Sequence, residues 1–205
     1  MEALYYCMTK RFAFMYSVKN LFRIVLCSFL LVALAQPVLA QESMKRVKIK
    51  DVASILMPEG FGPMTEADLN NKYETYRYPL AMYSDQGRMV DFGINRSFTT
   101  WQEGDILLVR DFYKASLFNM YTEVEIIQEE IREVNGRKYA IFEFVGRVKD
   151  EAKTFRNNKV VAKYIYIMYT IYEGNSIVVN FNAPEYVKEQ WQPVAREMME
   201  SFKLF

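Results

Sequence analysis

The residue types that most often carry out enzyme chemistry are scarce in this chain of 205 residues. It has no histidine, the commonest general base and metal ligand, and its two cysteines are Cys7 and Cys27. A nucleophilic serine needs a partner base. A lysine could serve as that base, so a catalytic Ser–Lys pair stays an open alternative. No serine after position 42 lies in a G-x-S-x-G motif. The serines in this part of the chain are Ser43, Ser54, Ser84, Ser97, Ser116, Ser176 and Ser201. The D-x-D-x-D-G calcium loop is also absent. We therefore predict no catalytic, cofactor-binding or metal-ligating residue.

A cluster of carboxylates is the main alternative, because two of them at the right separation can hydrolyse a glycosidic bond. In an unbroken strand, Glu125, Glu129 and Glu133 share one face. Ile127 and Ile131 share that face with them. The interpretation we favour is a solvated edge strand whose charges discourage pairing with other chains. The whole acidic set is Glu123, Glu125, Glu129, Glu130 and Glu133.

A group of tyrosines around one arginine is the best candidate for a binding surface. Tyrosine and arginine are enriched among the residues that anchor protein interfaces. The group lies near a predicted sheet edge, where Pro79 cannot donate a backbone hydrogen bond. The alternative is that these aromatic residues only form strands and pack beneath helices. The candidate interface residues are Tyr73, Tyr76, Arg77, Tyr78 and Tyr83.

The first 40 residues have the pattern of a secretory signal peptide. Four basic residues precede an apolar run at 24–35, and Val38-Leu39-Ala40 supplies a cleavage site before Gln41. Twelve helical residues span about 18 Å, well short of a hydrocarbon core of about 30 Å. We therefore predict an exported, periplasmic or secreted protein with no transmembrane segment after cleavage. Whether translation starts at Met1 or Met15 stays open.

Removal of residues 1–40 changes the chemistry of the chain. Both cysteines leave, with four basic residues and one acidic residue, so 22 basic residues face 24 acidic ones. The mature chain therefore has no disulfide, and its small net charge excludes a nucleic-acid partner. We predict a flexible lead-in at 41–50 and a single globular domain at 51–205.

The elements that would position these residues follow from periodicity and turn signals. Thr65 with Asp68, and Thr100 with Glu103, have the spacing of capping boxes that open helices. Asn135-Gly136 predicts a tight hairpin turn. The predicted strands are 53–57, 76–82, 90–98, 124–134, 137–148, 159–172 and 177–182, and the helices are 65–72, 100–119 and 187–202.

One predicted strand, 159–172, is apolar on both faces. A strand of this kind must be covered on both sides. We therefore predict an α+β fold, with an antiparallel sheet of six to seven strands and helices on both faces, an α/β/α sandwich. One face carries Tyr164, Tyr166, Met168 and Tyr172, and the other carries Ile165, Ile167, Tyr169 and Ile171.

Four short motifs resemble the PsbP-like family in order and spacing. That family includes a photosystem extrinsic subunit, bacterial envelope proteins and a nuclear-transport factor that binds Ran. The resemblance implies an antiparallel sheet between helical layers, and roles in binding or assembly. It implies no catalytic residue. The motifs are Leu56-Met57-Pro58-Glu59-Gly60-Phe61, Val179-Asn180-Phe181-Asn182-Ala183-Pro184, Trp191-Gln192-Pro193 and Glu200-Ser201-Phe202-Lys203.

Taken together, these patterns predict an exported, non-enzymatic binding or assembly module of the bacterial cell envelope, with a protein partner. The alternative is a carrier that holds a small apolar ligand or lipid between sheet and helix. An envelope enzyme that uses carboxylates or a Ser–Lys pair ranks last.

Overall fold

The computed structural model of the chain describes residues 43–73, 78–149 and 160–205. Residues 42–205 form a compact unit of their own, and this unit contains all the described helices and strands. The predicted signal peptide lies outside the described residues. No helix among the described residues is long and apolar enough to cross a membrane.

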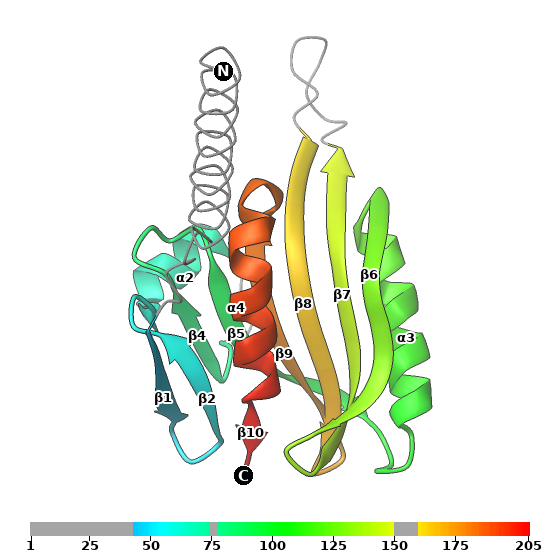
Figure 1. Cartoon of the computed structure of the whole chain (residues 1–205). Coiled ribbons are helices and arrows are strands. Elements are labelled where there is room, and N and C mark those ends of the chain that lie inside the picture. The colour runs from blue at the N-terminus through cyan, green and yellow to red at the C-terminus, as the bar shows by residue number, and fades with distance from the viewer. Residues whose placement is uncertain (1–42, 74–77, 150–159) are drawn as a thin grey trace, which may run out of the picture. The chain divides into compact units, whose positions relative to one another are not determined.

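The centre of the unit is an antiparallel sheet of seven strands in the order β3-β4-β5-β9-β8-β7-β6 (Figure 1). This confirms the predicted fold class. The Asn135-Gly136 turn is also confirmed, with φ angles of 49° and 83° that glycine and asparagine tolerate. The strands are β3 (Gly62–Pro63), β4 (Ala81–Ser84), β5 (Asp91–Thr100), β6 (Glu123–Val134), β7 (Arg137–Lys149), β8 (Val160–Tyr172) and β9 (Asn175–Pro184).

Helices cover both faces of this sheet, as predicted. α3 (Ile106–Met120) lies on one face and α4 (Lys188–Glu200) on the other (Figure 1). A small sheet of three strands, β1 (Met44–Ile49), β2 (Ala53–Pro58) and β10 (Lys203–Leu204), shares the core on the α4 side. A short helix, α2 (Glu66–Lys72), precedes β4, and a 3₁₀ turn, η1 (Glu185–Val187), leads into α4.

The two faces of β8 separate the two halves of the core. Tyr164, Tyr166 and Met168 are buried in the α4 layer. Ile165 and Tyr169 are buried in the α3 layer. The alternation predicted from the sequence is therefore confirmed, because each face of this central strand meets its own hydrophobic layer.

The flexible lead-in predicted for 41–50 is wrong for residues 44–49. These residues form β1 and pair antiparallel with β2 along its full length, from Met44 opposite Pro58 to Ile49 opposite Ala53. The polar composition misled the prediction, because β1 is an edge strand that turns its lysine side chains to solvent and buries Ile49.

One of the two predicted capping boxes is present. Asp68 N–H donates to Thr65 Oγ1 at 3.2 Å, and Thr65 N–H donates to Asp68 Oδ2 at 2.9 Å. The second box is wrong, because Thr100 ends β5 opposite Asn175 and α3 begins only at Ile106.

Candidate functional site

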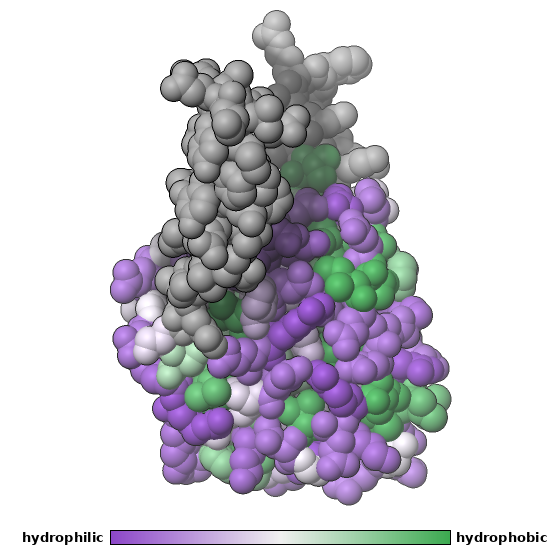
Figure 2. Space-filling model, in the orientation of Figure 1, coloured by the Kyte–Doolittle hydropathy of each residue, from purple (hydrophilic) through white to green (hydrophobic). Residues whose placement is uncertain are grey.

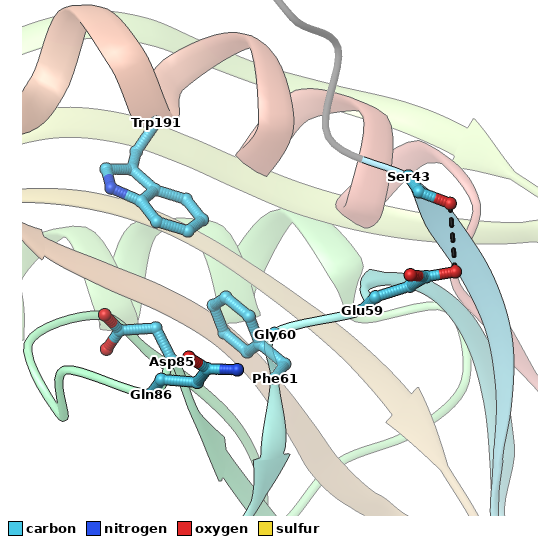
Figure 3. Close-up of a pocket in the computed structure, with 7 residues that line it drawn as sticks. All are labelled: Ser43, Glu59, Gly60, Phe61, Asp85, Gln86 and Trp191. Atoms are coloured by element: carbon cyan, nitrogen blue, oxygen red, sulfur yellow. Dashed lines mark hydrogen bonds between the residues drawn. The ribbon is translucent and has the colours of Figure 1, made fainter.

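An open cavity of about 300 Å³ lies where four separate segments of the chain meet (Figure 3). The residue before β1, the β2–β3 turn, the β4–β5 turn and α4 each contribute to its wall. We call this cavity the aromatic pocket. Its lining residues are Ser43, Glu59, Gly60, Phe61, Asp85, Gln86 and Trp191.

Two aromatic rings form the base of the aromatic pocket. Phe61 and Trp191 meet edge to face, with ring centroids 5.6 Å apart. Trp191 also packs on Phe181 of β9 at 6.1 Å, which connects the pocket to the core. Trp191 is 8% exposed and Phe61 is 5% exposed, so most of each ring is fixed by packing and only a small surface faces the cavity. The base of the pocket is therefore rigid before any partner arrives.

The rim of the aromatic pocket is acidic. Asp85 is fixed by its own turn, since its Oδ1 accepts hydrogen bonds from the N–H groups of Met89 at 2.7 Å and Val90 at 2.8 Å. Glu59 accepts a hydrogen bond from the Ser43 hydroxyl at 3.0 Å. Among the lining residues that the structure describes are these two carboxylates and no basic side chain. A positively charged group would therefore find both an aromatic surface and a favourable field here.

The three described tyrosines of the set singled out from the sequence do not form one exposed group. Tyr73 donates a hydrogen bond to Asp91 Oδ2 at 2.6 Å, and burial and that bond raise the pKa of its phenol. Tyr83 packs on Phe92 at 6.5 Å and is half-buried. Tyr78 is 66% exposed. The remaining two, Tyr76 and Arg77, lie outside the described residues, and the interface role of the set stays a prediction.

The shared face predicted for the acidic residues of β6 is wrong. A bulge falls between Ile126, which pairs with Phe144, and Gln128, which pairs with Glu143. Because a bulge adds one residue, it reverses the side to which the later residues point. Two ion pairs that reach to opposite sides of the sheet show the result. They are Glu125 with Arg147, which also binds Glu185 before α4, and Glu129 with Lys114 of α3.

A buried carboxylate that sequence reasoning missed lies between the sheet and α4. Glu143 of β7 is fully buried and accepts hydrogen bonds from Tyr164 and from Gln192 and Arg196 of α4. Arg196 Nη2 lies 2.9 Å from Glu143 Oε2. Burial and the Glu143 charge raise the pKa of Tyr164. The signal available was a single glutamate within the apolar run of β7.

The layer proposed for an apolar ligand is filled with side chains. Phe181 of β9, Met198 of α4 and Phe202 after it are all fully buried there. A carried ligand would have to displace these packed groups. Within the described part of the chain, no group of three or more Cys, His, Asp or Glu side chains is placed to hold a metal ion.

Comparison with known proteins supports the fold. No sequence-family model and no curated protein matches the chain. Among solved structures, cyanobacterial PsbP (CyanoP) from Synechocystis sp. PCC 6803 matches at 15% identity and a TM-score of 0.52, over 83% of this chain and 98% of that one. The fold is therefore PsbP-like.

Two further structures match with lower TM-scores. The Ran-binding protein Mog1p of Saccharomyces cerevisiae has 15% identity and a TM-score of 0.48, over 80% of this chain and 96% of that one. LpqN of Mycobacterium tuberculosis, involved in cell envelope biogenesis, has 12% identity and a TM-score of 0.48, over 79% and 90%.

Proposed function

We propose that this protein is an exported, non-enzymatic binding module of the bacterial cell envelope, and that it contacts a partner protein through the aromatic pocket. The observation that carries this proposal is the pocket itself, which combines a rigid aromatic base with an acidic rim. The neighbouring layer between sheet and α4 is filled, so the pocket is a contact point at the surface rather than the mouth of a ligand chamber.

The chemistry of the pocket selects its occupant. A lysine or arginine side chain has an aliphatic stem that can lie against Phe61 and Trp191. Its charged end would then meet Glu59 or Asp85, which lie on opposite sides of Phe61 (Figure 3). A volume of about 300 Å³ is at the lower limit of small-molecule sites and suits one long side chain. The proposed partner is therefore a protein that presents a basic residue.

Selection of short peptides tests this proposal directly. Residues 42–205, immobilised, are used to select from a random heptapeptide library, and the binding of enriched peptides is measured by calorimetry. We expect enrichment of Lys or Arg beside an aliphatic residue. Gln86→Lys, which adds a cation to the rim, should weaken binding at least tenfold.

The matched control is Gln102→Lys, which makes the same change at an exposed position before α3 and should leave binding unchanged. Selected peptides that lack basic residues, or that bind Q86K as tightly as the original chain, would reject the pocket as the contact point.

Export is tested separately with the leader. Residues 1–45 fused to an alkaline phosphatase that lacks its own leader should give active enzyme outside the cytoplasm, with cleavage after Ala40. A fusion without residues 24–35 is the control and should be inactive. Activity of both fusions, or of neither, contradicts the signal peptide.

The tyrosine interface is part of the proposal at one described position. Tyr78 exposes two thirds of its surface, so its ring is available to a partner without unfolding. Tyr78→Ser should weaken binding of the selected peptides or of the natural partner. Because the side chain is exposed, this change should leave the urea midpoint of unfolding unchanged. Unaltered binding would remove the tyrosines from the proposed contact.

A further inference from the structure

α3 is apolar on two opposite faces, although only one of them meets the sheet. Val109 and Leu117 point inward and are buried against β7 and β8. The outward face exposes four large apolar side chains, which project from the same side of the helix. These are Leu107 at 57%, Leu108 at 59%, Phe112 at 47% and Phe118 at 47%. Surface helices usually carry polar residues on this face, so the outer face of α3 calls for a partner.

The exposed apolar area of this face matches one side of a dimer interface. At roughly 200 Å² per large side chain, about half exposed, the four residues present on the order of 400 Å². An ordinary interface contributes about 800 Å² from each partner, of which roughly 60% is apolar. The outer face of α3 therefore supplies most of the apolar surface that one subunit of a dimer needs. On the α4 side, by contrast, hydrophobic residues are interspersed with hydrophilic ones (Figure 2).

The charges on and beside this face are already neutralised within the chain. Arg110 pairs with its neighbour Asp111 at 2.8 Å. Lys114 pairs with Glu129 of β6 at 2.7 Å. The face therefore has no excess of one charge that would select an anionic lipid surface or a strongly charged protein, and it would not repel an identical copy.

We propose that the outer face of α3 is the interface of a homodimer, in which two copies of α3 pack antiparallel about a two-fold axis. In such an interface each residue contact occurs twice. If the two-fold axis crosses α3 at the level of residue 113, Leu108 of one copy lies opposite Phe118 of the other. Asp111 then lies opposite Ala115, whose small side chain lets the two helices approach closely.

Sedimentation equilibrium of residues 42–205 tests the dimer, and the register suggests a pair of matched variants. Ala115→Lys places a cation opposite Asp111 of the second copy at both symmetric positions. Ala115→Glu places an anion there instead. We expect the dissociation constant of the A115E dimer to be at least tenfold larger than that of the A115K dimer. Leu108→Glu should dissociate the dimer as well.

Tyr186→Glu is the control, because Tyr186 is 76% exposed but lies before α4, on the other face of the sheet. It should leave the dimer intact. Even weak interfaces associate at about 1 mM. The proposal would therefore be overturned if the original chain is still a monomer at that concentration. A dimer that L108E leaves intact, or that A115E and A115K affect equally, would also overturn it. Circular dichroism tests whether each variant is folded. If L108E is unfolded, the comparison of A115E with A115K decides the result.

Discussion

Replacing Arg196 by methionine should destabilise the protein more than loss of any exposed ion pair. Methionine retains most of the aliphatic stem, so the change mainly removes the guanidinium that faces Glu143. The carboxylate of Glu143 is fully buried and would keep only the hydrogen bonds from Tyr164 and Gln192. Both remaining donors are neutral, so the buried charge would have no counterion.

The size of the effect follows from the burial of the two partners. Removing one member of a fully enclosed ion pair costs about 3–5 kcal/mol. The Arg196 side chain is 45% exposed, so water partly screens the pair and can partly replace the guanidinium. We therefore expect a loss of about 2–3 kcal/mol in the free energy of unfolding. Removing both charges with Glu143→Gln and Arg196→Met should recover part of the loss, because the remaining amide needs no counterion.

Urea unfolding at pH 7, followed by circular dichroism, measures these differences as shifts of the midpoint at constant slope. Arg96→Met is the matched control. Arg96 pairs with Glu173 at 3.4 Å on the surface, and its loss should cost less than about 1 kcal/mol. The reasoning fails if R196M costs no more than R96M. It also fails if the double variant is less stable than R196M alone.

Three other outcomes follow from the packing and the titration of buried groups. Gly146→Ala should destabilise the protein by about 1–3 kcal/mol in the same urea assay, because the new Cβ would lie 2.6 Å from the ring of Tyr121. Gly60→Ala is the control, because nothing lies within 4 Å of the Cβ added there. Tyr139→Phe should leave stability at pH 7 unchanged or slightly higher, because no described group hydrogen-bonds to the buried Tyr139 hydroxyl; a marked loss would reveal a missed partner. Burial raises the pKa of Tyr139 and of Tyr166 to about 12, above the ordinary value of 10, so their contribution to stability is complete below pH 10 and is lost as the pH rises towards 12. Unfolding midpoints measured from pH 8 to 12 should fall over that interval, and less steeply in Y139F; parallel curves would contradict this assignment.

Local patterns were enough to predict most elements of the fold. The alternation in β8 depends on residues two positions apart, and each face found the layer that its apolar side chains require. The Asn135-Gly136 turn depends only on backbone conformations that these two residues tolerate. Predictions failed where a distant partner decided the outcome. Thr100 was available as a helix cap, but it pairs with Asn175 in the sheet instead.

The candidate site was less accessible to sequence reasoning. Glu59, Phe61 and Trp191 stood within the motifs that resemble the PsbP-like family, so a signal for the aromatic pocket was present. Nothing local indicated that the β4–β5 turn would complete it. The bulge in β6 was equally hidden, because its position depends on which residues of β7 lie opposite.

The amino-acid sequence alone determined the layered architecture and excluded histidine and thiol chemistry from the predicted mature chain, since both follow from composition and short-range periodicity. Only the tertiary structure decided where the candidate functional surfaces lie. Glu143 finds its partners in α4, which follow it by 49 and 53 positions, and the aromatic pocket joins four segments between Ser43 and Trp191. The physical reason is the same in both cases: the environment of a side chain is set by the elements packed against it, and these come together only when the chain folds.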